Sequence, residues 1–271
     1  MKGGVIIPTV KANGINIYYE VKGEGTPLLL IEGLGYATWM WYRQEKLQQN
    51  FQLIKFDNRG VGGSDKPQDP YSVELMAQDA AQLMEALEID KANVLGVSLG
   101  GFIAQELAYS YPDKVEKLIL CSTSFGGPNS IPIPQETLEV MQKGGGEYSS
   151  LDELRNAVGV ALDRRLWDEN QDIIDKILHE KSTNPQPKHA YLRQMEAGAA
   201  FNGEEKTSHI KAPTLILAAK GDRVVPWENA QLLHDKIPHS RLELLSEGGH
   251  LFFMERPDTA NNLIREFLKE D

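Results

Sequence analysis

The segment Gly96-Val97-Ser98-Leu99-Gly100-Gly101 joins two stretches of opposite character. The apolar run Ala92–Val97 leads into it and predicts a short buried strand, while Leu99–Tyr111 has the spacing of a helix. A serine on such a turn has a strained backbone that lifts its hydroxyl above the sheet, at a helix N-terminus where N–H groups favour negative charge. Glycines two residues to either side avoid a collision with the neighbouring strand and helix. The segment therefore predicts that Ser98 is a nucleophile.

Short apolar runs alternate with helical patterns along most of the chain. We expect strands at Thr9–Ala12, Ile15–Glu20, Leu28–Ile31, Leu53–Phe56, Ala92–Val97, Val115–Cys121, Thr214–Ala219 and Arg241–Leu245. We expect helices at Ser72–Glu88, Leu99–Tyr111, Glu228–Lys236 and Thr259–Leu268. Buried strands that alternate with helices are typical of a mostly parallel sheet covered on both faces. The pattern therefore predicts the α/β class.

The regular alternation stops after Phe125. Residues 126–205 contain several prolines and the triplet Gly144-Gly145-Gly146, and they show no strand pattern. Their helical patterns lie at Leu151–Asp168, Asp172–Lys181 and Ala190–Ala199. We expect a single α/β domain, with a core made of residues 1–125 and 206–271 and a helical cap inserted as residues 126–205.

Charge and composition limit the partners that we expect. The 271 residues carry a formal net charge of −11, and non-specific nucleic-acid binding needs a basic surface instead. The one cysteine, Cys121, lies in an apolar run, which predicts a buried thiol and excludes both an internal disulfide and a Cys-based zinc site. Residues Met1–Pro8 lack the apolar stretch of a signal peptide, and no apolar run approaches the roughly 20 residues of a membrane span. We expect a cytoplasmic monomer or homodimer that binds a small molecule, and neither nucleic acid nor membrane.

Two further residues follow predicted strands and complete a candidate catalytic set. Asp222 comes directly after Thr214–Ala219, and His250 comes soon after Arg241–Leu245. In open α/β sheets, sites lie past the carboxyl ends of the strands. A serine hydroxyl is a poor nucleophile without a base, and that base must be oriented by a third group. The sequence therefore predicts Ser98 as nucleophile, His250 as base and Asp222 as the orienting carboxylate.

The chain resembles the α/β-hydrolase fold superfamily, in its capped branch, over nearly its full length. The matching motifs are Gly96–Gly101, Gly221-Asp222, Gly249-His250 and Asp57-Asn58-Arg59-Gly60-Val61-Gly62-Gly63-Ser64. We interpret the last motif, which is similar to the family's D-x-R-G-x-G-x-S turn, as structural. The resemblance implies the α/β-hydrolase fold, with an eight-stranded, mostly parallel sheet, helices on both faces and a helical cap inserted after the sixth strand.

Within the superfamily the chain is most similar to small esterases and lactonases, such as 3-oxoadipate enol-lactonase and the anthracycline methylesterases. That similarity implies a serine hydrolase that cleaves a small, largely uncharged carboxylic ester or lactone through an acyl-enzyme intermediate. A serine nucleophile also fits hydrolysis of C–C bonds in ring-cleavage products. Some members of the superfamily are ligand receptors in which binding matters more than turnover, so this third possibility stays open.

The segment after the third predicted strand departs from the family's pattern. Family members usually have a His-Gly pair there, whereas this chain has Glu32-Gly33-Leu34-Gly35. An oxyanion hole needs backbone N–H donors, and Leu34 and Leu99 can supply them whatever their side chains are. Glu32 is either a buried carboxylate with a partner or a solvated charge at the rim. We favour the buried, structural role.

Apolar and aromatic residues near these motifs predict a hydrophobic substrate pocket. We expect Tyr36, Phe125 and Leu251 to line it. Trp41 and Phe252 lie equally close in sequence, and core packing explains them as well as pocket lining does. Such a pocket predicts a preference for uncharged esters of modest size.

The same region contains a near match to a dinucleotide-binding fingerprint. Gly33-Leu34-Gly35-Tyr36-Ala37-Thr38 follows a predicted strand, and Asp57 ends the next one. Thr38 stands where the third glycine belongs, which disfavours this alternative. The six histidines show no metal-binding spacing. We therefore expect neither a cofactor nor a metal ion.

Overall fold

Eight strands form one sheet in the computed structural model, which describes residues 8–144 and 148–270. The strands are β1 (Thr9–Ala12), β2 (Ile15–Lys22), β3 (Pro27–Ile31), β4 (Gln52–Phe56), β5 (Ala92–Val97), β6 (Val115–Cys121), β7 (Thr214–Ala219) and β8 (Ser240–Leu245). Their order across the sheet is β1-β2-β4-β3-β5-β6-β7-β8. The β1–β2 and β2–β4 pairs are antiparallel and the remaining pairs are parallel. The predicted eight-stranded, mostly parallel sheet is confirmed.

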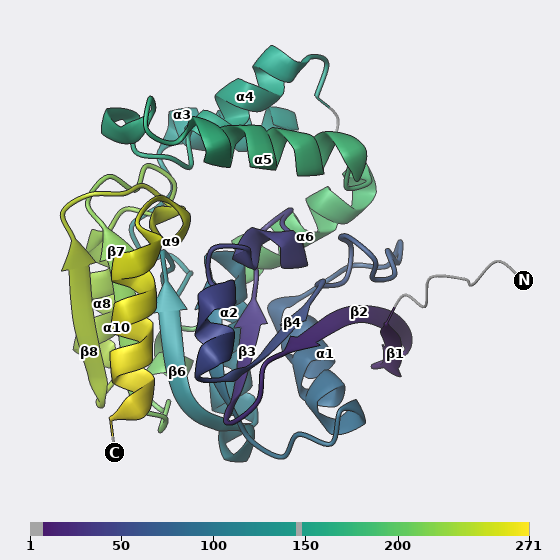
Figure 1. Cartoon of the computed structure of the whole chain (residues 1–271), viewed down its shortest axis with the longest axis vertical. Helices are drawn as coiled ribbons and strands as arrows, with labels where there is room; N and C mark the ends of the chain where they lie inside the picture. Colours follow the sequence, from purple (N-terminus) through teal and green to yellow (C-terminus); the bar gives the residue numbers. More distant parts are fainter. Residues whose placement is uncertain (1–7, 145–147, 271) are drawn as a thin grey trace, which may run out of the picture.

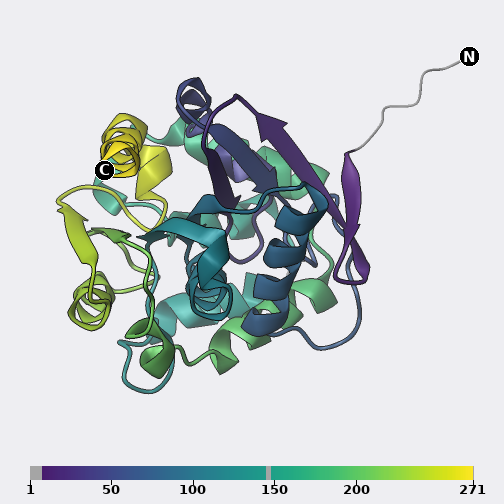
Figure 2. The same ribbon diagram turned by 90° about the horizontal axis from the view of Figure 1, so that it is seen from below.

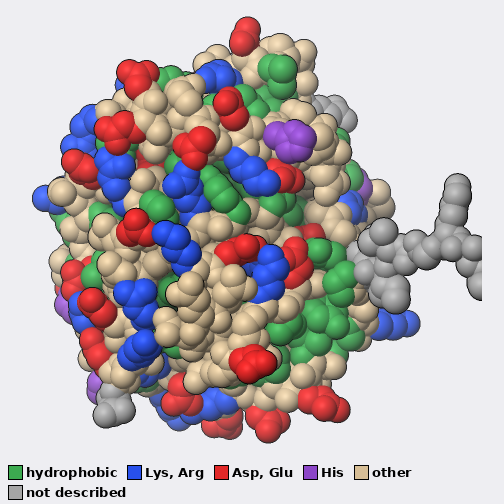
Figure 3. All heavy atoms as spheres, in the orientation of Figure 1, with side chains coloured by type: hydrophobic (Ala, Val, Ile, Leu, Met, Phe, Trp, Pro, Cys, Tyr) green, Lys and Arg blue, Asp and Glu red, His purple; other side chains and the backbone are tan. Residues whose placement is uncertain are grey.

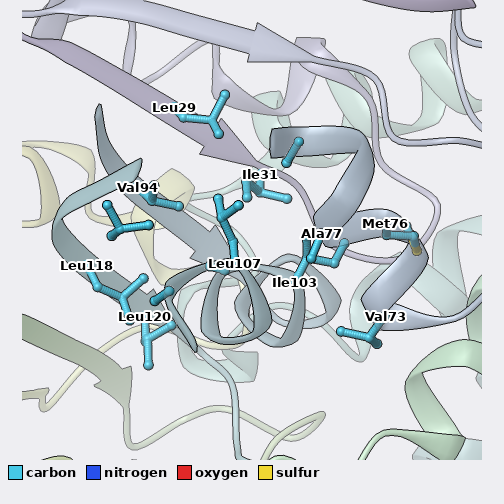
Figure 4. Packing of buried hydrophobic residues seen from close by; sticks show 14 of the residues in the cluster. Leu29, Ile31, Val73, Met76, Ala77, Val94, Ile103, Leu107, Leu118 and Leu120 are labelled. Carbon is cyan, nitrogen blue, oxygen red and sulfur yellow. The ribbon is translucent and has the colours of Figure 1, made fainter. Parts of the chain in front are cut away.

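Helices cover both faces of the sheet (Figures 1 and 2). One face carries α1 (Val73–Ala86), α2 (Leu99–Ser110) and α8 (Glu228–Lys236), and the other carries α10 (Pro257–Lys269) and the short 3-10 helices η1 (Thr38–Trp41) and η2 (Glu45–Gln49). Successive residues of a strand point to opposite faces. In β3, Leu29 and Ile31 pack toward α1 and α2 (Figure 4), while Leu28 and Leu30 belong to the cluster on the other face. The central strands are therefore apolar throughout, as a sheet buried on both sides requires.

Two expectations about individual elements are wrong. The pattern Leu151–Asp168 is not one helix, because α4 (Leu151–Gly159) ends at Gly159 and the 3-10 turn η4 (Arg164–Leu166) follows it. Asp163 starts that turn, since its carboxylate accepts a hydrogen bond from the N–H of Arg165 at 3.0 Å. Strand β8 was expected to be buried on both faces, but all its residues are half-buried, because β8 pairs only with β7 and forms the edge of the sheet.

Among the described residues, four longer helices separate β6 from β7 in sequence and lie beyond the carboxyl ends of the strands (Figure 1). They are α3 (Gln135–Gly144), α4, α5 (Gln171–Thr183) and α6 (Lys188–Ala200). Helix α3 was not among the helical patterns predicted for this segment. Gly126 and Asn202 form an isolated antiparallel bridge, and the Gly203 N–H donates to the Phe125 carbonyl at 2.7 Å. The helical segment thus leaves and rejoins the sheet at one place.

Acidic and basic side chains are interspersed on the face of the molecule in Figure 3. The thiol of Cys121 is buried, as predicted, and burial raises its pKa above the ordinary range. No helix within residues 8–144 and 148–270 is both long and apolar enough to cross a membrane.

Candidate active site

Ser98 lies at the turn between β5 and α2 with a strained backbone. Its φ is 55° and its ψ is −118°, a conformation that costs a non-glycine residue on the order of 1–3 kcal/mol. Hydrogen bonds hold it there: its N–H donates to the Cys121 carbonyl at 3.0 Å, and its own carbonyl accepts from the Gly101 N–H at 2.8 Å and the Thr123 hydroxyl at 2.9 Å. Its side chain makes no capping hydrogen bond to α2. The hydroxyl is therefore presented to the space above the sheet.

The glycines around Ser98 are required by close contacts. A Cβ atom at Gly96 would lie less than 3.0 Å from the carbonyl oxygen of Gly100 in the following helix. A Cβ atom at Gly100 would lie as close to the carbonyl oxygen of Ile31 at the end of β3. Each contact brings the start of helix α2 against a strand: β5 at Gly96 and β3 at Gly100. The sequence predicts close packing of this kind on both sides of the turn.

Asp222 and His250 form a buried hydrogen-bonded pair at the ends of β7 and β8. His250 Nδ1 and Asp222 Oδ2 are 2.9 Å apart. The second oxygen of Asp222 accepts the N–H groups of Val224 at 2.8 Å and Val225 at 2.9 Å. The Ser122 hydroxyl donates to the carbonyl of His250 at 2.9 Å. The carboxylate is thus fixed by the backbone, and it fixes the orientation of the imidazole in turn.

A buried carboxylate that sequence reasoning missed supports the loop before His250. Glu255 accepts the Gly249 N–H with one oxygen, and with the other it accepts the Asp163 N–H at 3.0 Å and the Asn170 amide at 2.8 Å. Asp163 in turn accepts the N–H of Gly248 at 3.2 Å. Burial raises the pKa of Glu255 above its usual value. The histidine loop is therefore tied to the segment between α4 and α5, which no local pattern in the sequence indicates.

The loop after β3 lies next to Ser98 on its other side. A Cβ atom at Gly33 would lie 3.3 Å from the Cβ of Ser98, so the two backbones pass close together. The N–H groups of Leu34 and Leu99 donate no hydrogen bond to any other described residue. Leu34 and Ser98 both line the two cavities described below, and Leu99 lines one of them. The predicted oxyanion donors are thus available near the serine.

Glu32 has the buried, structural role that we favoured. Its side chain is fully buried, and its carboxyl accepts the Asn58 N–H at 3.1 Å. The Asn58 amide returns a hydrogen bond to the Glu32 carbonyl at 3.1 Å. Burial raises the pKa of Glu32 well above its usual value, and nearby Asp57 adds to the effect. Glu32 therefore joins the loop after β3 to the turn after β4.

Two residues of helices α5 and α6 also hold the loop after β3, and sequence reasoning missed both. The Gly35 N–H donates to the side-chain oxygen of Gln194 at 3.2 Å, and the Gly35 carbonyl accepts from Lys181 Nζ at 2.8 Å. The Gln194 amide also donates to the Arg59 carbonyl at 2.8 Å. Gln194 lies on α6 and Lys181 on α5. Only contacts between residues more than a hundred positions apart reveal these roles.

Two cavities meet at Ser98. Cavity A is lined by Leu34, Tyr36, Ser98, Lys181, His250 and Leu251, with further residues of α3, α4 and α6. Cavity B is lined by Leu34, Ser98, Leu99 and mostly apolar residues such as Phe102, Ile133, Met195 and Phe201. Both lie between the carboxyl ends of the strands and the helical segment that joins β6 to β7.

The residues expected to line the pocket do not all lie in one place in the structure. Tyr36 and Leu251 line cavity A. Phe125 lines neither cavity: its side chain is fully buried in the hydrophobic cluster with α1, α2 and α8, under the Lys236 ammonium. Trp41 and Phe252 are also fully buried in the core. Phe125 lies in the loop after β6, which ends at Cys121, and its side chain turns into the hydrophobic cluster and not toward the cavities.

Asp57 has a structural role that is incompatible with binding a ribose. Its two oxygens accept the N–H groups of Thr38 and Gly63, each at 2.7 Å. The segment after β3 forms the 3-10 helix η1 in place of the long helix that a dinucleotide fingerprint opens. No cluster of three metal-ligating side chains lies within the described residues.

The chain matches the family model described as alpha/beta hydrolase fold over residues 26–171 and 161–257. It is 30% identical to a poly(3-hydroxyalkanoate) depolymerase of Ectopseudomonas oleovorans, with 91% of this chain and 85% of that one covered. The solved enol-lactonase of Burkholderia xenovorans is 26% identical, with 97% and 100% covered and a TM-score of 0.87. A solved N-acyl homoserine lactone degrading enzyme is 30% identical, with 96% and 100% covered and a TM-score of 0.84.

The chain therefore belongs to the α/β-hydrolase fold family. Within that family it is a hydrolase of the esterase/lactonase branch.

Proposed function

We propose that the protein hydrolyses carboxylic esters or lactones through a covalent acyl-enzyme on Ser98. The observation that carries this proposal is the 2.9 Å pairing of His250 with Asp222, together with the position of Ser98 and His250 in the lining of one cavity. A nucleophile, a base and an orienting carboxylate in this chain order are the parts that acyl transfer needs.

In the first half-reaction His250 takes the hydroxyl proton of Ser98 as Oγ forms a bond to the substrate's carbonyl carbon. The carbonyl electron pair moves to its oxygen, and the N–H groups of Leu34 and Leu99 bind that oxyanion. Asp222 keeps the proton of the neutral imidazole on Nδ1 and stabilises the imidazolium. When the bond to the leaving alcohol breaks, His250 gives its proton to the departing alkoxide.

The second half-reaction repeats these steps with water. His250 takes a proton from water as the water oxygen attacks the acyl carbon, and the oxyanion forms between the same two N–H groups. Collapse of this intermediate breaks the bond to Ser98 Oγ, which receives its proton back from His250. The products are a carboxylic acid and an alcohol, or one hydroxy acid when the substrate is a lactone.

The cavities support a substrate with a mainly apolar acyl group. Cavity B is large enough for a small molecule, and its lining is mostly hydrocarbon. We propose that Tyr36 and Leu251 contact the substrate in cavity A. The residues 126–205, joined to the sheet at Gly126 and Asn202, are proposed as a cap over both cavities.

The test is turnover of short and medium p-nitrophenyl esters, lactones and a β-diketone by wild type and Ser98→Ala. Removing the nucleophile should lower kcat on esters by roughly 10⁴–10⁶-fold, with an unchanged circular dichroism spectrum and melting temperature. Ser208→Ala, which changes an exposed serine, is the matched control and should keep wild-type rates. Ester hydrolysis by Ser98→Ala at the wild-type rate would refute the assignment.

The same panel distinguishes the alternatives. Cleavage of the β-diketone with little ester turnover would assign the site to C–C bond hydrolysis, which uses the same three side chains. Tight binding of esters by wild type without any turnover would indicate a ligand receptor.

A further inference from the structure

Lys181 places a cation inside cavity A. It lies on α5, and its side chain lines the cavity together with Ser98 and His250. Its Nζ donates to the Gly35 carbonyl at 2.8 Å and lies 4.5 Å from the centre of the Tyr36 ring. The lining of cavity B has no charged side chain among the described residues. The two cavities therefore differ in charge.

The ammonium of Lys181 has hydrogen-bonding capacity left over. It carries three N–H groups, and the Gly35 carbonyl accepts from one of them. No carboxylate within residues 8–144 and 148–270 forms an ion pair with it, and its neighbour Glu180 is paired with Lys176. The Lys181 side chain is half-buried, and a cation partly removed from water without a counter-ion is costly. A ligand group with negative charge is the partner that this position lacks.

An ester bound at Ser98 extends into both cavities, with a different part of the molecule in each. Ser98 lines both of them, so a carbonyl carbon attached to its Oγ lies at their junction. His250 lines cavity A and not cavity B. Because the general acid must reach the leaving oxygen, the leaving alcohol lies on the side of cavity A. The acyl chain then occupies the apolar cavity B.

We propose that Lys181 recognises an anionic group, with a carboxylate as the simplest case, on the alcohol part of the ester. The proposal rests on the proposed function, because it takes Ser98 as nucleophile and His250 as the acid that protonates the alcohol. It replaces the expected, largely uncharged substrate by one with an apolar acyl chain and an acidic leaving group. Lys181 is thus a specificity-determining residue.

The protonation state of Lys181 is compatible with this role. Burial lowers the pKa of Lys181 to about 8. The ammonium is therefore still the main form at neutral pH. A carboxylate bound beside it would raise the pKa further, because an opposite charge favours the charged form.

Two matched pairs of esters test the proposal. O-hexanoyl glycolate and O-hexanoyl glycolamide differ only in a carboxylate or amide on the alcohol part. Monoethyl adipate and ethyl adipamate carry the same difference on the acyl part. For each pair the measurement is the ratio of kcat/KM for the anionic ester to that for the neutral one.

Wild type should prefer the glycolate over the glycolamide by about tenfold or more, the effect of a hydrogen bond to a charged group. Lys181→Met should lower that ratio to about one, and Lys181→Arg should retain part of it. Lys188→Met, which removes an exposed lysine on α6, should leave the ratio unchanged. Melting temperatures identify variants that are unfolded.

The outcomes separate this proposal from the proposed function. Equal ratios in wild type and Lys181→Met would overturn the proposal, while Ser98-dependent hydrolysis of the neutral esters would leave the proposed function intact. A preference for the adipate carboxylate would overturn the assignment of the alcohol to cavity A. Calorimetric binding of both glycolate esters to Ser98→Ala reports recognition without turnover. Tighter binding of the anionic ester, lost in Ser98→Ala/Lys181→Met, supports the proposal even if wild type hydrolyses neither ester.

Discussion

The carboxyl edge of the sheet and the cap helices meet at Ser98 and contribute different things to the site. At the sheet edge, Ser98, Asp222 and His250 each lie shortly after a strand. From the cap side come Lys181 on α5 and Gln194 on α6, which share no motif. The edge supplies the groups proposed to carry the reaction, whereas the cap supplies groups that touch the loops and line the cavities.

The difference shows that the helical segment between β6 and β7 also holds the loops of the site. The histidine loop is tied to Asp163, and the loop after β3 is held at Gly35 by Gln194 and Lys181. Both loops next to Ser98 thus depend on hydrogen bonds from the helical segment. Substitutions at the sheet edge should therefore remove the chemistry, and substitutions in the cap should change its rate or its substrate preference.

The largest effect is expected at the sheet edge, from Asp222→Asn. The N–H groups of Val224 and Val225 would keep the asparagine oxygen in the place of Oδ1, so the amide NH₂ would face His250. The imidazole would then hold its proton on Nε2, where it cannot accept the proton of Ser98. We expect kcat on a neutral ester to fall by on the order of 10⁴-fold.

The control for this variant is Asp90→Asn, which changes an exposed aspartate before β5 and should keep the wild-type rate. The melting temperature of Asp222→Asn should stay close to that of wild type, because the side chain keeps its shape. A loss of less than tenfold would show that Asp222 does not set the tautomer of His250.

Much of the sheet edge was predictable because local rules determine it. The spacing of Gly96, Ser98 and Gly100 follows from contacts between a strand and the next helix, which any sequence at this turn must satisfy. Asp222 and His250 were found because parallel strands end at the same edge. Phe125 was misplaced because it lies in the irregular loop after β6, where no sequence periodicity indicates which way a side chain points.

The cap was predictable only as a set of helices. Helical periodicity indicated α5 and α6, yet it could not show which of their residues would face the loop after β3. Lys181 and Gln194 act through contacts with Gly35, which is about 150 residues away in sequence. Glu255, in the short helix α9 (Phe252–Glu255), is similar, because its partners Asp163 and Asn170 come from the turn before α5.

A smaller effect is expected in the cap, from Gln194→Ala. The Gln194 side chain is buried and bridges the Gly35 N–H to the Arg59 carbonyl, so it positions the loop that carries the Leu34 N–H. Its loss should lower kcat by roughly tenfold, a fraction of the loss that follows removal of an oxyanion donor itself. KM should change little, because an oxyanion exists only in the transition state and intermediates.

The matched control is Gln142→Ala, which changes an exposed glutamine on the cap helix α3. Gln194→Glu keeps the acceptor for the Gly35 N–H and should restore part of kcat. If Gln194→Ala lowers the melting temperature but leaves kcat unchanged, the residue stabilises the cap and does not position the loop.

The smallest effect is expected in the pH dependence of substrate preference. Lys181 faces Tyr36 after β3, Tyr191 on α6 and Tyr148 before α4, and burial raises the pKa of all three phenols. These groups therefore stay neutral where Lys181 titrates. His250 lies across cavity A. Because it acts in the hydrolysis of anionic and neutral esters alike, its contribution cancels in the ratio of their kcat/KM values.

Because burial lowers the pKa of Lys181 to about 8, its ammonium is present below that pH and is lost above it. Roughly nine-tenths of the molecules carry the charge at pH 7 and roughly one-tenth at pH 9. The glycolate-to-glycolamide ratio of kcat/KM should therefore fall several-fold between these values in wild type. In Lys181→Arg the ratio should stay constant, because a guanidinium keeps its charge. If the wild-type ratio does not change with pH, the charge of Lys181 does not determine the preference for the anionic ester.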